Sequence, residues 1–247
     1  MDAEPGVRAF GLGNMLAGSL NLGPQNFGPG RTVDMAGIYI SGVYLVNSMP
    51  RNYFQGCDVL YLTFSDNPPA ADVTDILQWL EEDENRILIV QFDNASTNYT
   101  MMDRLGLATT FGNNIAPYTY TSDDAPDFIK YGPFGTLTSD FYYQCRDNTY
   151  GTIAPAVAEA AGFIPILRST SVASSGYYIL AVNPDRRIII SGDIDLYGNV
   201  NEGSTGSYLS LTATNAATMT IDPNNPAHVL MGNLWAWIVD VCLTEQE

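Results

Sequence analysis

Short apolar runs alternate with polar turn clusters along this chain, and the clearest of them predict a strand–helix–strand unit. The apolar run 57–64 is typical of a strand covered on both faces, and it stops at the polar and proline residues of 65–69. Residues 70–82 place apolar side chains at helical spacing, with acidic residues in the first turn, where the helix dipole favours negative charge. A second apolar run follows over 86–92, so we expect two parallel strands joined by a right-handed crossover.

The rest of the chain predicts further elements around the same sheet. A third core strand is expected over 187–193, after a turn at 183–186, and a terminal helix over 226–243 should dock on the sheet. Other expected elements are a strand at 7–12, helices at 14–22, 99–105 and 153–161, and strands at 163–169 and 176–182. We therefore predict one α/β domain over 1–247, a three-layer sandwich around a mainly parallel sheet, with a Tyr- and Gly-rich loop insertion at about 111–150.

Composition narrows the classes of partner. The chain has 10 Lys and Arg against 27 Asp and Glu, and its formal net charge is −17. Nucleic acid and anionic lipid are therefore not expected partners, because both are bound through clustered basic side chains. With 46% hydrophobic and only 15% charged residues the chain should fold as a globule, and no apolar run is long enough to predict a transmembrane helix.

The residue usage favours an exported protein. Lysine is nearly absent, Asn, Thr, Tyr and Gly are abundant, and the first six residues resemble an initiator placed before a trimmed mature chain. We therefore expect a bacterial protein of the periplasm or cell surface whose signal peptide has been removed. Cys57, Cys145 and Cys242 are widely separated, so at most one disulfide bond could form, and three buried thiols are the simpler interpretation.

Three segments carry a resemblance to a known family. They are CDVLYLTFSDNPPAADVTDILQWLEEDENRILIVQFDN, TNYTMMDRLGL, and NPDRRIIISGDIDLYGN followed later by NLWAWIVDVCL. Over about 59–243 the chain resembles class I glutamine amidotransferase-like domains of the ThuA-like, flavodoxin-like branch, which implies a flavodoxin-like fold. The catalytic Gly-x-Cys-x-Gly turn is missing at 91–96, and His228 is the only histidine. The resemblance is therefore to a non-catalytic branch, and an enzyme of the amidotransferase type is not expected.

Polar residues follow each of the three predicted core strands. Ligands of open α/β sheets bind at the carboxyl ends of the strands, so these residues are expected to form one acidic rim. They are Asp66, Asn67, Asp93, Asn94, Asp193 and Asp195. Their oxygen atoms could hold Ca²⁺ or Mg²⁺, with Asp193 and Asp195 as the first candidates, or orient a sugar. The alternative is that each side chain caps a following helix or closes a turn.

Aromatic residues are concentrated between 118 and 150. Tyrosine-rich loops supply rigid, amphipathic contact area, so Tyr131, Tyr142 and Tyr143 are candidate ligand contacts. The alternative is that these rings attach the loops to the core.

The function that these features favour is that of an exported, non-catalytic binding or accessory module that recognises a carbohydrate or a protein partner at the carboxyl rim. Two alternatives stay open: a hydrolase or isomerase of a sugar-like substrate, with Asp93 and Asp193 as acid and base and a divalent ion, and a structural domain of a larger surface assembly. Catalysis would require two carboxyl groups facing one cleft with separated pKa values.

Overall fold

A computed structural model describes most of the chain after residue 50. The described residues are 51–62, 68–92, 100–112, 118–143, 150–172, 174–193, 199–201, 208–210 and 223–243. The strand predicted at 7–12 and the helix predicted at 14–22 lie outside them. No helix within the described ranges is long and apolar enough to cross a membrane.

Three parallel strands form one half of the sheet. Strand β1 (Val59–Leu62) pairs in parallel with β2 (Ile87–Gln91), which pairs in parallel with β9 (Ile188–Ser191). Helix α3 (Ala70–Glu81) connects β1 to β2. Every residue of β2 and β9 is buried, which is why their sequences are almost uninterrupted Ile, Leu and Val. The prediction that these three segments run side by side in one direction is confirmed.

The other half of the sheet is antiparallel. Strand β8 (Tyr178–Asn183) pairs with β9 and β7 (Ile164–Ser169), and β4 (Tyr118–Tyr120) pairs with β7 and β5 (Phe141–Tyr143). The short turns between β7 and β8 and between β8 and β9 leave no room for a crossover, so these strands must reverse direction.

Over the residues that the structure describes, the main sheet has nine strands and is mixed. Its order is β1-β2-β9-β8-β7-β4-β5, with β3 (Thr109–Gly112) and β6 (Tyr150–Ile153) attached as an antiparallel pair through β8. The predicted parallel arrangement therefore applies to the β1-β2-β9 half. The region expected to be an insertion at about 111–150 supplies β4 and β5 to the main sheet. A separate pair is formed by β10 (Asn199–Asn201) and β11 (Tyr208–Ser210).

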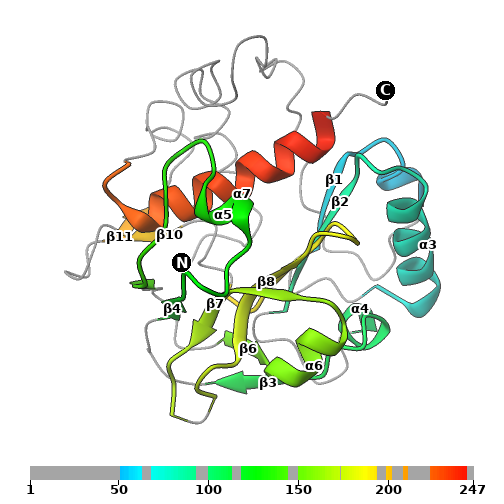
Figure 1. The fold of residues 1–247 in the computed structure, drawn as a ribbon. Coiled ribbons are helices and arrows are strands. Elements are labelled where there is room, and N and C mark those ends of the chain that lie inside the picture. Colours follow the sequence, from blue (N-terminus) through cyan, green and yellow to red (C-terminus); the bar gives the residue numbers. More distant parts are fainter. Residues whose placement is uncertain are drawn as a thin grey trace.

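Helices cover both faces of the sheet (Figure 1). Helix α7 (Pro226–Leu243) and helix α5 (Asp127–Lys130) share one hydrophobic cluster with Ile87 and Ile89 of β2. Helices α3, α4 (Thr100–Arg104) and α6 (Pro155–Ala160) share a second cluster with Leu88 and Val90. Alternate residues of β2 thus enter opposite cores, as expected of the central strand of a three-layer α/β arrangement. A short 3₁₀ turn, η2 (Arg51–Tyr53), precedes β1.

Arginines at the amino ends of β2 and β9 hold the end of helix α3. Arg86 donates a hydrogen bond to the carbonyl oxygen of Trp79 (2.7 Å), and Arg187 donates one to that of Leu80 (2.6 Å). The last carbonyls of a helix have no partner within the helix, and α3 has no basic residue in its own last turn. The arginine at the start of each of these two apolar runs therefore donates a hydrogen bond to a carbonyl in the last turn of α3. Arg187 makes its hydrogen bond from a left-handed backbone conformation (φ 55°).

Asn233 fastens the segment after α5 to helix α7. Its Nδ2 donates hydrogen bonds to the carbonyl oxygens of Ile129 (2.8 Å) and Gly135 (3.0 Å), and its Oδ1 accepts one from the N–H of Phe134 (3.0 Å). The side chain is completely buried. A Cβ at Gly132 would overlap it, so the close approach requires glycine there.

Candidate functional site

The candidate site lies at the carboxyl ends of the central parallel strands. Gln91 is the last residue of β2, and its Cα is in register with that of Ser191, the last residue of β9. Ile89 and Ile189, which lie two positions earlier on the same strands, both belong to the hydrophobic core beneath α7. Because side chains alternate along a strand, Gln91 and Ser191 face the α7 side of the sheet as well. Two polar side chains thus stand next to each other where the apolar strands end.

Gln91 is buried in an unusual way. The residue is 0% exposed, and neither its Oε1 nor its Nε2 has a hydrogen-bond partner in the part of the chain that the structure describes. A primary amide offers two N–H donors and one carbonyl acceptor. Leaving such a group buried and unsatisfied costs about 1–3 kcal/mol, and native proteins do so rarely.

Asp193 brings a carboxylate to the same edge. The residue is completely buried, and one of its carboxylate oxygens accepts a hydrogen bond from the hydroxyl of Tyr118 on β4. The hydroxyl of Ser191 donates to the backbone carbonyl of Asp193 (3.0 Å), which leaves the lone pairs of Ser191 as acceptors. Tyr118 belongs to the core beneath α7, so the carboxylate is held on the side that Gln91 faces.

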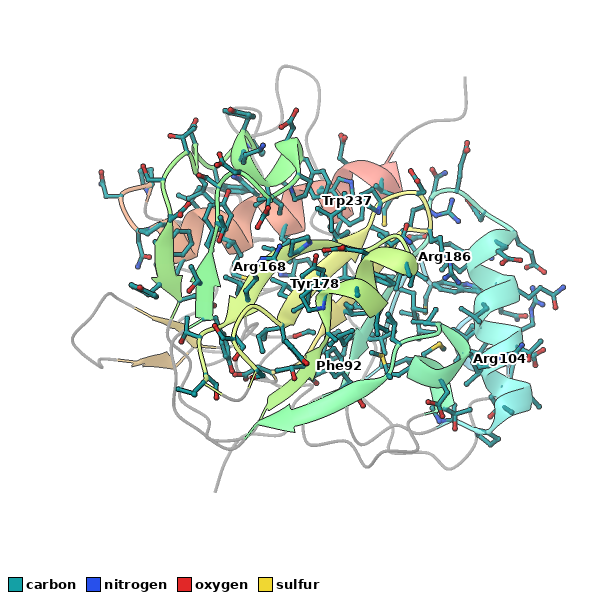
Figure 2. All side chains as sticks on the ribbon, turned by 60° about the horizontal axis from the view of Figure 1, so that its bottom comes forward. Phe92, Arg104, Arg168, Tyr178, Arg186 and Trp237 are labelled. Atoms are coloured by element: carbon teal, nitrogen blue, oxygen red, sulfur yellow. The ribbon has the colours of Figure 1, made fainter. Side chains whose placement is uncertain are left out.

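At this edge of the sheet the backbones of Gly151 and Gly192 lie in direct contact. The N–H of Gly151 on β6 donates a hydrogen bond to the carbonyl oxygen of Gly192 (2.6 Å). A Cβ at Gly192 would overlap the carbonyl oxygen of Gly151, and a Cβ at Gly151 would overlap the ring of Phe92. Figure 2 shows Phe92 at the opposite end of the sheet from Arg186, which precedes β9. The Gly192–Asp193 pair is therefore required by the approach of β6 and by the contact with Tyr118.

The structure places only part of the predicted rim. Asp193 lies at the carboxyl edge as predicted. The other predicted rim residues, Asp66, Asn67, Asp93, Asn94 and Asp195, lie outside the described residues. Asp195 was also the second predicted metal ligand, and the described residues contain no group of three His, Cys, Asp or Glu side chains that could hold a metal ion.

The predicted tyrosine contacts separate into exposed and buried rings. Tyr131 is 61% exposed and Tyr142 is 71% exposed, so both rings are accessible. Tyr143 is 1% exposed and belongs to the core beneath α7. Several other aromatic side chains of this region are also in that core: Tyr118, Tyr120, Phe134, and in part Phe128 and Phe141. These rings mainly attach the segment to the sheet.

Arg168 on β7 forms a second polar group, on the other face of the sheet. Its guanidinium lies over the ring of Tyr178 (4.6 Å to the centroid) and donates two hydrogen bonds to Asp124 (2.9 and 3.1 Å). Figure 2 shows Arg168 and Tyr178 side by side. Burial, together with a hydrogen bond to Glu159, raises the pKa of Tyr178 to about 12. All these groups have partners, so we interpret this cluster as structural.

The described cysteines are not prepared for nucleophilic chemistry. Cys57 and Cys242 are free thiols, and Cys145 lies outside the described residues. Burial raises the pKa of Cys57, with a smaller effect from Asp58. Burial, followed by the negative charges of Asp58 and Asp83, raises the pKa of Cys242 to about 12. A thiol must ionise to attack a substrate, and both thiols are held in the protonated form.

Sequence reasoning missed Gln91 and Ser191 as site residues, and it placed Tyr118 only among the aromatic residues of 118–150, without its contact with Asp193. Gln91 was assigned to a buried apolar strand, where its position as the one polar residue among Ile, Leu, Val and Phe was a usable signal. The role of Tyr118 depends on a contact between residues 75 positions apart, and no local pattern predicts such a contact.

Comparison with known proteins adds no relative. No protein-family model matches this chain, and neither a curated protein nor a solved structure is significantly similar to it. The chemistry of the carboxyl edge is therefore what indicates a function.

Proposed function

We propose that this protein is a non-catalytic binding module that holds a small polar ligand at the carboxyl edge of β2 and β9. The observation that carries the proposal is the amide of Gln91, which is buried without a hydrogen-bond partner among the described residues. It stands beside Ser191 and on the side of the sheet where Tyr118 holds Asp193. Open α/β sheets bind their ligands at this edge.

The amide of Gln91 is informative because leaving it buried and unsatisfied lowers the stability of the folded protein. An apolar residue of similar size at position 91 would remove an unsatisfied buried group, at a gain of about 1–3 kcal/mol. A polar side chain that lowers stability is typical of a functional site, where local rules are broken for binding. A ligand hydroxyl or amide would satisfy both atoms of the Gln91 side chain.

The proposal places this binding module in an exported protein related to class I glutamine amidotransferase-like domains. Kinship is supported by the parallel β1-α3-β2 unit and by the Gly192–Asp193 pair at the end of β9. Export is supported by the acidic, lysine-poor composition. Tyr142, with its ring exposed, is a candidate for a secondary contact with a larger carbohydrate or with a protein partner.

A ligand screen with a matched pair of variants tests the proposed function. The midpoint of thermal unfolding should rise with at least one probe from a panel of neutral sugars, Ca²⁺, Mg²⁺, inorganic phosphate and acetamide. Asp193→Asn should reduce that rise. Asp185→Asn, in the exposed turn before β9 at the other end of the sheet, should leave it unchanged. If no probe shifts the wild-type midpoint, the binding function is wrong; turnover of a bound sugar would instead favour a hydrolase or isomerase.

A further inference from the structure

We infer that the ligand at the carboxyl edge is a neutral polyhydroxyl compound and that Gln91 determines this specificity. The inference rests on the proposed binding function and adds the ligand class. The side chain of Gln91 has donors and an acceptor to satisfy at one place, and the neighbouring groups are acceptors. Few classes of ligand supply both kinds of partner.

The hydrogen-bond donors and acceptors that a ligand offers to Gln91 discriminate between the classes of ligand. A metal ion or an ammonium group can satisfy the Oε1 of Gln91, but neither supplies an acceptor for its Nε2. Carboxylate supplies acceptors for Nε2 but no donor for Oε1, whereas phosphate keeps a P–OH donor near neutral pH and is disfavoured by its charge instead. A hydroxyl group is donor and acceptor at once, so two adjacent hydroxyl groups satisfy both ends of the amide.

The neighbouring groups favour a ligand that donates. The carboxylate of Asp193 accepts hydrogen bonds, and the hydroxyl of Ser191 already donates its proton to the carbonyl oxygen of Asp193. A polyol can donate to both positions while it also contacts Gln91. Both residues are completely buried, which strengthens these hydrogen bonds relative to the same bonds in water.

Charge argues against an anionic ligand. The described basic side chains are engaged elsewhere: Arg86 and Arg187 with helix α3, Arg51 with Glu82, Arg104 with Thr74, Lys130 with Asp127, and Arg168 with Asp124. Arg186 lies in the turn at the amino end of β9. With a formal net charge of −17, the protein as a whole also repels anions.

The test combines two readouts on Gln91→Met, which keeps an unbranched side chain of similar length. We expect the thermal midpoint of the ligand-free protein to rise by roughly 2–6 °C, because the unsatisfied amide is removed. We expect affinity for the best neutral sugar among glucose, galactose, mannose and arabinose to fall at least tenfold, measured by titration calorimetry or saturation-transfer NMR. Gln91→Leu gives the same two readouts if the Met variant does not fold. Gln78→Met makes the same chemical change at an exposed position of α3 and should alter neither.

The outcomes separate this inference from the proposed function. If the wild-type protein binds Ca²⁺, phosphate or acetamide but no sugar, the ligand class is wrong while the binding function stands. If sugar binds and Gln91→Met leaves its affinity unchanged, Gln91 is not the specificity residue. A lower midpoint for both variants would show that the amide is satisfied in the free protein and would overturn the argument for its role. If no probe binds to the wild-type protein, the binding function and the ligand class fail together.

Discussion

The hydroxyl of Tyr118 on β4 donates a hydrogen bond to the buried carboxylate of Asp193, which follows β9. This contact joins the antiparallel half of the sheet to the carboxyl edge of the parallel half, across two intervening strands. The Tyr- and Gly-rich segment is therefore part of the support of the candidate site. Its aromatic side chains position a carboxylate that the third core strand alone would leave without this donor.

Tyr118→Phe should destabilise the protein by about 1.5–3 kcal/mol. The substitution keeps the buried ring and removes the hydrogen bond that Tyr118 donates to Asp193, and depriving a buried acceptor of a donor costs about this much. Urea unfolding followed by fluorescence measures the free energy of unfolding. Tyr142→Phe, which removes a hydroxyl from an exposed ring, is the matched control and should have no measurable effect. Equal stability of the Tyr118 variant and the wild-type protein would show that the contact contributes nothing.

Substitution of Arg187 by glycine and by alanine should change the stability of the protein by different amounts. Both Arg187→Ala and Arg187→Gly remove the hydrogen bond to the carbonyl of Leu80, so both should destabilise the protein. Alanine keeps the strain of the left-handed backbone, about 1–2 kcal/mol, whereas glycine relieves it and adds chain entropy of about 0.5–1 kcal/mol to the unfolded state. The glycine variant should therefore be more stable than the alanine variant by about 1 kcal/mol. The reverse order in urea unfolding would contradict the strain at this position.

The sequence predicted the three parallel strands and the position of Asp193, but it did not predict the partner of Asp193. The reasons differ from residue to residue. The apolar runs around Leu60, Ile89 and Ile189 were sufficient for β1, β2 and β9. Strands β2 and β9 are buried throughout, as such runs predict, whereas β1 ends the strand order and only its last residue is buried. The position of Asp193 followed from the rule that ligands bind at carboxyl ends. Its partner Tyr118 did not, because the pairing of β4 with β7 is a long-range contact.

The strands predicted at 163–169 and 176–182 are confirmed as β7 and β8, but β4 and β5 escaped prediction for a related reason. Strands β4 and β5 have three residues each, so their periodicity is too short to recognise. The function of Asn233 was hidden as well, because its three hydrogen bonds run to a segment about 100 positions earlier in the chain. In both cases tertiary contacts decide the structure.

Asn233→Leu should destabilise the protein by about 3 kcal/mol or more. The substitution fills the space with an apolar side chain but leaves the N–H of Phe134 and the carbonyls of Ile129 and Gly135 without the partner that Asn233 supplies. Differential scanning calorimetry gives the change in the unfolding midpoint. Asn224→Leu, in the described turn before α7, is a comparison at a position whose residue is exposed.

Asn233→Asp gives a second, pH-dependent test of the same contact. The substituted carboxylate would place negative charge against two carbonyl oxygens, which favours its protonated form and raises its pKa in the folded state. A raised folded pKa gives stability at low pH that is lost as the pH rises through that value. The variant should therefore be closest to wild-type stability near pH 4 and weakest above pH 7. A constant difference across that range would contradict direct contact with the carbonyls.

The stability of the wild-type protein should fall in alkaline solution, between about pH 9 and pH 12. Burial raises the pKa of Tyr120 to about 12 from its ordinary value of 10, with further contributions from Asp140 and Tyr131. The pKa values of Tyr178 and Cys242 are also raised to about 12, from ordinary values of 10 and 9. In each case the folded protein holds the proton more tightly than the unfolded chain does. The stability that these groups contribute is therefore complete below the unfolded values and is lost as the pH rises through the folded ones.

Urea unfolding at pH 7, 9, 10 and 11, with tyrosinate absorbance at 295 nm recorded in parallel, measures this loss. The absorbance of the buried tyrosines should appear together with unfolding at the higher pH values, because ionisation and burial exclude each other. Tyr120→Phe removes both the ionisable group and its hydrogen bond to Leu137, so its stability should start lower but fall less steeply with pH. A slope as steep as that of the wild-type protein would show that Tyr120 does not carry the alkaline sensitivity.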